Sequence, residues 1–237
     1  MYQGQILILQ LILVKLDPMP TLSNAPILWS FRRCPFAMRA RLAIAVSGQI
    51  VQLREILLRD KPAAFLATSA KGTVPVLDLL DGTVIEESRD IMMWALGAND
   101  PDGWLVTWQK QPDKAKTFLD NVDGPFNHEL DRYKYPSRYE VSAAWQHREN
   151  GAQFLAELDR SLGSTGALSG ADLGFMDFAI LPFIRQFRIA DPKWFDSQPW
   201  PYLHRWLQEF LGSAVFLRVM LKYPPWQKGA KAVRFPA

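Results

Sequence analysis

The sequence has one cysteine among its 237 residues, Cys34, and therefore cannot form an intrachain disulfide. This absence excludes the small secreted domains that depend on a disulfide framework, and it favours a reducing compartment such as the cytoplasm. Histidine is also scarce. The three histidines, His128, His147 and His204, are far apart in the chain and none is four residues from another. This spacing does not predict a zinc site, and we expect no bound metal.

The sequence has almost no excess of charge of either sign. It contains 27 Lys and Arg residues against 24 Asp and Glu residues, which leaves a net charge of +3. The basic residues are interleaved with acidic ones, whereas a nucleic-acid interface needs a basic patch. The glycine-rich motifs that bind nucleotide phosphates are missing as well. We therefore expect no nucleic-acid partner and no bound nucleotide.

The sequence also lacks a hydrophobic run long enough to cross a membrane. The most apolar stretch, residues 5–16, is shorter than the ~20 residues that a spanning helix needs. It carries neither the positive segment nor the small-residue cleavage site of a secretory signal. We interpret residues 1–24 as an N-terminal extension outside the folded domains. Met19 is a candidate for the natural start of translation.

The sequence does contain enough apolar residues, 49%, to form one large domain or two ordinary ones. Residues 25–97 show the order strand, helix, strand, helix, strand, strand, helix. The first two strands are joined by a helix and should be parallel. The last two are joined at Asp81-Gly82, a turn typical of a hairpin. This order predicts an α/β domain with a mixed four-stranded sheet.

The second half of the sequence has the periodicity of helices only. Residues 98–104 are rich in turn formers and read as a linker between domains. Beyond them the apolar residues recur at helical spacing, in segments 113–133, 139–162, 174–190 and 198–221. We therefore expect an all-α domain over residues 105–237.

Cys34 lies just after the first strand and just before the first helix, with Pro35 in the first helical turn. A thiol at a helix N-terminus is stabilised as thiolate by the helix dipole and by unpaired N–H groups, and Arg32 and Arg33 could add to this effect. Such placement predicts a thiol pKa lowered from ~8.5 toward ~3.5–7.5. The alternative is an inert, buried cysteine. This stretch alone does not decide between them.

Two further motifs could recognise a peptide. Pro75 begins the third strand, where a cis bond would leave the backbone N–H and C=O of Val74 free to pair with an extended ligand. The trans form is the common one, since cis accounts for about 5–6% of such bonds. Glu87 and Ser88 begin the next helix. They could cap it, or they could bind the charged groups of an amino acid.

Taken together, these motifs resemble the cytosolic glutathione transferase family. The sequence Cys-Pro-Phe-Ala at residues 34–37 is similar to the active centre of the omega-like group. Lys61-Pro62 stands thirteen residues before Val74-Pro75, and Glu87-Ser88 begins thirteen residues after Val74, as in that group. The resemblance extends from about residue 27 to about residue 226. It implies a thioredoxin-like N-terminal domain followed by a helical domain, often assembled as a two-fold dimer.

The resemblance implies glutathione as co-substrate and assigns residues to bind it. Val74, followed by a cis Pro75, would hydrogen-bond the cysteinyl backbone of glutathione. Glu87 and Ser88 would hold its γ-glutamyl end, and Lys61 would reach its glycyl carboxylate. The charges fit this assignment, because glutathione carries two carboxylates and one ammonium group.

The resemblance also implies an activity for Cys34, which would form a mixed disulfide with glutathione. The expected reaction is thiol transfer, either deglutathionylation or reduction of an acceptor of the dehydroascorbate type. Ala37 occupies the position where a redox pair would need a second cysteine, so a monothiol route follows. The acceptor would be a small electrophilic, disulfide or oxidised compound. Trp104 and Trp108, near the domain junction, are candidates for lining its pocket.

Two other functions remain open. One is conjugation, in which the thiolate of glutathione attacks an electrophile with Ser30 or Cys34 close to the sulfur. The other is a non-catalytic binding or regulatory module with the same fold. One departure from the family also bears on the fold. Gly174 stands where a Ser or Thr usually caps a helix, three residues before the buried Asp177 of the family.

Overall fold

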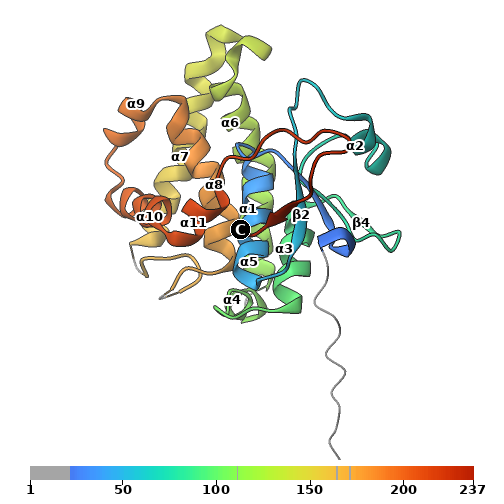
Figure 1. Ribbon diagram of the computed structural model, residues 1–237. Helices are drawn as coiled ribbons and strands as arrows, with labels where there is room; N and C mark the ends of the chain where they lie inside the picture. Colours follow the sequence, from blue (N-terminus) through green and yellow to red (C-terminus); the bar gives the residue numbers. More distant parts are fainter. Residues whose placement is uncertain (1–21, 111, 164, 171) are drawn as a thin grey trace, which may run out of the picture.

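The structure of the protein is a computed structural model that describes residues 22–110, 112–163, 165–170 and 172–237 (Figure 1). The apolar stretch 5–16 and the candidate start Met19 lie outside the described residues. The last three residues of the interpreted extension, Leu22–Asn24, form a short 3-10 helix, η1, directly before the first strand.

A mixed sheet organises the N-terminal half of the chain. Its strand order is β4-β3-β1-β2-β5. β1 (Ile27–Ser30) pairs in parallel with β2 (Val51–Glu55), and in antiparallel fashion with β3 (Val76–Asp78). β4 (Val84–Ile85) completes the predicted hairpin with β3. The four predicted strands and their directions are therefore confirmed.

The sheet has a fifth strand that the prediction missed. β5 (Val233–Phe235) pairs antiparallel with β2, and Val51 lies opposite Phe235 in the register. In Figure 1 the C-terminal segment runs back from the helices to the edge of the sheet. The Phe235 ring is fully buried beneath the guanidinium group of Arg41. The predictions of a four-stranded sheet and of a purely helical second half were therefore wrong about β5. A strand of three residues is too short to show a periodicity in the sequence.

Helices cover both faces of the sheet. Side chains of successive β1 residues alternate between two clusters of buried residues. Leu28 packs with α1 (Pro35–Ser47) and α3 (Ser88–Ala98), whereas Trp29 packs against Phe65 of α2 (Ala63–Thr68) at 5.5 Å between ring centroids. All four β1 residues are buried, which explains why the strand reads as a continuous apolar run.

The remaining helices form the second half of the molecule around α8, most of whose residues are buried. The predicted stretch 113–133 is divided by a π-helical turn, η2, which contains Pro125. No helix in the described part of the chain is both long and apolar enough to span a membrane. The elements that follow α3 are α4 (Leu105–Lys110), α5 (Pro112–Asn121), η2 (Val122–Phe126), α6 (Asn127–Lys134), η3 (Pro136–Arg138), η4 (Val141–Ala143), α7 (Ala144–Leu162), α8 (Phe175–Ala190), α9 (Pro192–Asp196), α10 (Pro201–Gly212) and α11 (Ala214–Val219).

Candidate functional site

Cys34 lies at the N-terminal end of α1, as predicted, in the N-cap position with extended backbone angles. Its N–H donates to the carbonyl of Phe31 at 2.9 Å, which closes the loop after β1. The ring of the nearby Phe36 packs edge-on against Phe183 of α8, with 4.8 Å between ring centroids. The sheet, α1 and α8 therefore meet around a half-buried thiol.

The predicted electrostatic state of Cys34 is wrong. Burial raises the pKa of the Cys34 thiol above its ordinary value. The N–H groups of Ala37 and Phe36 and the charge of Arg39 lower this pKa, but together they offset only part of the effect of burial. The net effect keeps the pKa of Cys34 above its ordinary value, which favours the neutral thiol. Desolvation, which depends on the folded surroundings of the thiol, outweighs the helix dipole at this site.

The thiol contacts the backbone of the predicted peptide-binding residue. The Sγ atom of Cys34 donates to the carbonyl oxygen of Val74 at 3.6 Å. The Val74-Pro75 peptide bond is cis, as the resemblance implies. Val74 precedes β3, whose pairing with β1 begins at Val76. The structure thus brings Cys34 and Val74 together at one edge of the sheet.

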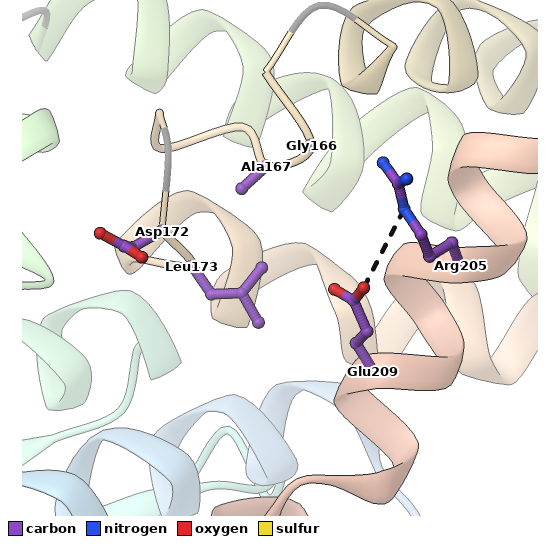
Figure 2. A pocket seen from close by; sticks show the side chains of 6 residues that line it. All are labelled: Gly166, Ala167, Asp172, Leu173, Arg205 and Glu209. Carbon is purple, nitrogen blue, oxygen red and sulfur yellow. Dashed lines mark ion pairs between the residues drawn. The ribbon is translucent and has the colours of Figure 1, made fainter.

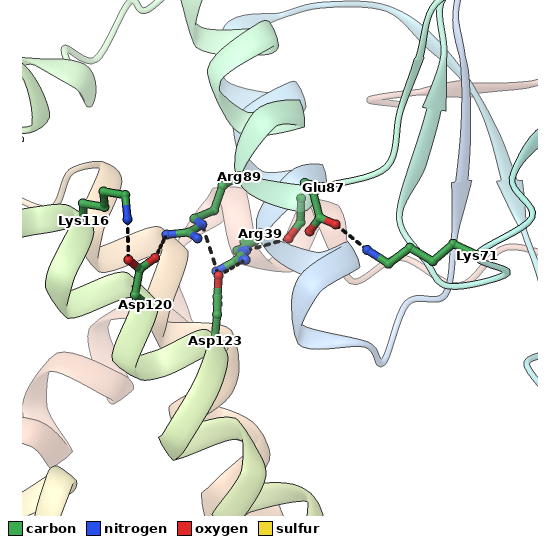
Figure 3. Close-up of polar contacts among 8 residues, drawn as sticks. Arg39, Lys71, Glu87, Arg89, Lys116, Asp120 and Asp123 are labelled. Atoms are coloured by element: carbon green, nitrogen blue, oxygen red, sulfur yellow. Dashed lines mark hydrogen bonds and ion pairs between the residues drawn. The ribbon is translucent and has the colours of Figure 1, made fainter.

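Glu87 and Ser88 lie at the start of α3, but neither caps it through a side-chain hydrogen bond. The carboxylate of Glu87 pairs instead with Lys71 and is mostly exposed (Figure 3). The hydroxyl of Ser88 is buried and accepts a hydrogen bond from Nε of Arg39 at 2.9 Å. The helix N-terminus is therefore flanked by an exposed carboxylate and a hydroxyl held by a buried guanidinium group.

Arg39 connects this region to the helical half. Its guanidinium group is almost fully buried and donates two hydrogen bonds to Asp123, at 2.8 and 2.9 Å. Arg89 also pairs with Asp123, and with Asp120 of α5 (Figure 3). Such bidentate pairs hold a fixed geometry. This network was not predicted from the sequence. Its signal in the sequence is a pair of arginines, Arg39 and Arg41, on an otherwise apolar stretch of α1.

Lys61 lies just before α2, on the same side of the molecule as Val74. Its side chain extends toward Gly72, where its Nζ atom would lie 3.7 Å from a Cβ built on that glycine. The ion pairs found among the described residues do not include Lys61. Cys34, Val74 and Lys61 therefore lie along the region between α1 and α2.

The two candidate acceptor residues pack against the start of α8. Trp104 is 2% exposed and stacks on Phe178, with 3.8 Å between ring centroids, while Trp108 packs against Phe175. These contacts lie in the first turns of α8, whereas Phe183 and Gln186, further along α8, are the residues near Cys34. The interval from Phe175 to Gln186 spans about 16 Å of helix. The place of Trp104 and Trp108 in an acceptor pocket therefore stays a prediction, while their observed contacts are packing contacts at the start of α8.

Ser30 is also unsuited to the role considered for it. It is the last residue of β1 and is 0% exposed. Its hydroxyl has no hydrogen-bond partner among the described residues. The prediction that this hydroxyl could donate to the sulfur of a ligand is therefore not supported by its position, because burial separates it from any ligand.

Two of the three histidines, His128 and His147, are closer together in the fold than their separation in the sequence suggests. His128 of α6 and His147 of α7 lie on either side of the Glu129 carboxylate, at 3.1 and 2.7 Å from its oxygens, and all the potential donor atoms lie within 4.8 Å of one another. Asn150 also donates to Glu129. Burial opposes the charged form of Glu129, but these hydrogen bonds leave its pKa below the ordinary value. The packing of α6 on α7, invisible in the sequence, creates this cluster.

A separate hollow lies at the other end of α8. A cavity of about 350 Å³ opens between the loop that precedes α8 and the α10 helix (Figure 2). Its charged residues on α10, Arg205 and Glu209, face each other with 4.0 Å between their nearest charged atoms. None of the residues predicted for the site lines this cavity.

Comparisons with known proteins agree with this architecture. Residues 28–102 match the family described as "Glutathione S-transferase, N-terminal domain", and residues 127–209 match "Glutathione S-transferase, C-terminal domain". Together the two matches cover about two thirds of the chain.

Individual relatives are more distant. The chain is 40% identical to glutathione S-transferase omega-1 of Sus scrofa over 60 residues, a quarter of either chain. It is 25% identical to glutathione S-transferase U22 of Arabidopsis thaliana over 172 residues, or 72% of this chain and 77% of the relative. The fold is similar to that of glutathione transferase F7 from Populus trichocarpa. That comparison has a TM-score of 0.70 and 18% identity, and covers 84% of this chain and all of the other.

Proposed function

Because the chain belongs to the glutathione S-transferase family, we propose that it is a glutathione-dependent thioltransferase in which Cys34 is the nucleophile. The observation that carries this proposal is the contact of the Cys34 thiol with the carbonyl of Val74. The Cys34 sulfur thus lies beside the backbone group that would hold the cysteinyl residue of glutathione, which supports its role as the nucleophile. We also propose, from family analogy, a homodimer and a cytoplasmic location.

The residues around Cys34 match the charges of glutathione. Val74 would pair with the cysteinyl backbone, and Lys61 would bind the glycyl carboxylate. Glu87 would hold the ammonium group of the γ-glutamyl end, while Ser88 and the α3 N-terminus would hold its carboxylate. When the cysteinyl N–H of glutathione takes over the Val74 carbonyl, the Cys34 thiol loses its present acceptor. Its sulfur is then left facing the N–H groups of α1, which favour thiolate.

The proposed reaction has two exchange steps. The Cys34 thiolate attacks the glutathionyl sulfur of a mixed disulfide, so that a Cys34–glutathione disulfide forms and the acceptor thiolate leaves and takes up a proton. The thiolate of a second glutathione then attacks the glutathionyl sulfur of that intermediate. Oxidised glutathione leaves, and the Cys34 thiolate is regenerated. Ala37 offers no second thiol, which makes this second glutathione necessary.

Conjugation is the second candidate, and one observation favours it. Since burial raises the pKa of Cys34, its neutral thiol could donate a hydrogen bond to the thiolate of bound glutathione. In that case Cys34 would stabilise the nucleophile and would not itself form a disulfide.

We expect Lys61→Gln to weaken the binding of reduced glutathione about fivefold. The substitution removes one charge-assisted hydrogen bond to the glycyl carboxylate, a loss of about 1 kcal/mol. Isothermal titration calorimetry with reduced glutathione measures the change. The matched control is Lys110→Gln, which removes an exposed charge at the end of α4, away from the site.

An unchanged affinity in Lys61→Gln would remove Lys61 from the site while leaving the remaining assignments intact. Absence of glutathione binding by the unmodified protein would contradict the proposed function as a whole. That result would support the remaining alternative, a non-catalytic binding module with the same fold.

A further inference from the structure

Four cationic side chains lie near one another where the loop that precedes Cys34 meets the helical half of the molecule. Arg32 and Arg33 directly precede Cys34, Lys134 is the last residue of α6, and Arg185 lies on α8. We call these four residues the cationic cluster. No role was predicted for Lys134 or Arg185, because they are about 100 and 150 residues from Cys34 in the sequence.

Tertiary contacts bring these segments together. The buried amide of Gln186, the residue after Arg185, donates to the carbonyl oxygen of Arg33. The guanidinium group of Arg32 donates to the carbonyl of Met220 at 3.3 Å, so the β1–α1 loop is fastened to α8 and to the end of α11. Hydrogen bonds to backbone carbonyls therefore hold the loop that carries Arg32 and Arg33 against α8 and α11.

The charges of the cluster act on one another. Burial lowers the pKa of Lys134 to about 8, and the charges of Arg185 and Arg33 contribute to this shift. Burial also lowers the pKa of Arg185, to which the charge of Arg32 adds. Such like charges repel one another when water is partly excluded. The same arrangement attracts an anion, because each cation contributes to its binding.

Few anions of the protein itself offset these charges. None of the four side chains takes part in an ion pair among the described residues, whereas nearby Arg39 and Arg89 are both paired with carboxylates. Asp131 lies near enough to favour the charged form of Lys134, but its carboxylate accepts a hydrogen bond from Tyr139. Glu55 near Arg32 is paired with Arg41. The cluster is thus a surplus of positive charge.

The cluster and the proposed glutathione site are carried by different elements. Val74 and Lys61 lie near α2, whereas Lys134 and Arg185 lie on α6 and α8 of the helical half (Figure 1). The carboxylates of glutathione have their own partners in the proposed site. The cluster is therefore placed to bind the second participant in the reaction.

We propose that the cationic cluster binds the acceptor, and that the acceptor is a small molecule carrying a carboxylate or a similar anionic group. The inference rests on the proposed function for the position of glutathione, but it can be tested without turnover. The anionic group would pair with Lys134 and Arg185, and this pairing would direct the reactive atom of the acceptor toward the Cys34 sulfur.

Three symmetrical disulfides of similar size provide the probes: 3,3′-dithiodipropionate, with two negative charges; bis(2-hydroxyethyl) disulfide, which is neutral; and cystamine, with two positive charges. Their binding to Cys34→Ala protein is measured by calorimetry, so that no exchange takes place. We expect the dianion to bind about tenfold more tightly than the neutral disulfide, and cystamine to bind more weakly than either.

The double variant Lys134→Gln/Arg185→Gln, made in the Cys34→Ala background, should abolish this preference. The control Lys110→Gln/Arg160→Gln removes two exposed positive charges elsewhere and should keep it. Equal affinity for the three disulfides, no binding of the dianion, or a preference that survives loss of Lys134 and Arg185 would overturn the inference.

Turnover of the same disulfides by protein with Cys34 intact separates the two proposals. A charge preference in binding without any Cys34-dependent turnover would contradict the proposed function and leave the anion site standing. Cys34-dependent turnover with no charge preference in binding would support the proposed function and contradict the anion site.

Discussion

Cys34→Ala is expected to lower the glutathione-dependent reduction of bis(2-hydroxyethyl) disulfide about a thousandfold or more. The variant retains the residues assigned to glutathione but lacks the sulfur that forms the mixed disulfide, so the two exchange steps have no protein nucleophile. The neutral disulfide is chosen because its turnover does not depend on the cationic cluster. Oxidised glutathione is measured as the product.

The matched control is Ser30→Ala. Ser30 is fully buried and its hydroxyl has no partner among the described residues, so this change should leave turnover within about twofold. Conjugation of a chloronitrobenzene by the same variants separates the alternatives. If Cys34→Ala reduces the disulfide at the unmodified rate, the thioltransferase mechanism is wrong. If Cys34→Ala loses only the conjugation activity, the role of Cys34 is to stabilise the thiolate of bound glutathione.

Asp177→Ala is expected to lower the free energy of unfolding by about 3–5 kcal/mol, the largest stability effect that we predict. The Asp177 carboxylate is fully buried near the start of α8. Its removal leaves two buried and two partly buried donors without this acceptor, and each fully buried one costs about 1–3 kcal/mol. The donors are the backbone N–H groups of Leu168 (2.8 Å), Ser169 (3.0 Å) and Gly174 (3.0 Å) and the indole Nε1–H of Trp206 (2.9 Å).

Urea denaturation followed by tryptophan fluorescence measures this loss. Asp172→Ala is the control, because Asp172 is exposed in the same loop and its removal should change stability by less than about 0.5 kcal/mol. Similar losses in the two variants would show that Asp177 does not organise the start of α8.

The same region explains the glycine at position 174. A Cβ built on Gly174 would lie 2.8 Å from the Cβ and Oγ atoms of Ser169 and 3.4 Å from the carbonyl oxygen of Trp104. A Ser or Thr cap, which the family pattern favours, would not fit here without movement of the loop. Asp177 contributes to the cap instead, because its carboxylate accepts a hydrogen bond from the backbone N–H of Gly174.

The sequence could predict features that depend on neighbouring residues. The helix start at Cys34, the hairpin turn at Asp81-Gly82 and the mixed order of the first four strands follow from local turn and helix signals. The cis bond before Pro75 followed from the family resemblance, because local preference alone favours trans.

Features that depend on tertiary packing could not be predicted in this way. The raised pKa of Cys34 reflects burial by groups distant in sequence, whereas the helix dipole, which argued for a lowered pKa, is a local effect. The proximity of His128 to His147 and the burial of Trp104 likewise arise from helices that meet only in the folded chain. The same is true of Lys134 and Arg185, which is why the cationic cluster was not anticipated.

The intact mass of the protein after exposure to oxidised glutathione tests the central claim most directly. We predict an increase corresponding to one glutathione per chain, removed by reduced glutathione and absent in Cys34→Ala. Because Cys34 is the only cysteine, a disulfide adduct can form nowhere else. An unmodified mass under conditions in which the protein binds glutathione would contradict the proposed role of Cys34.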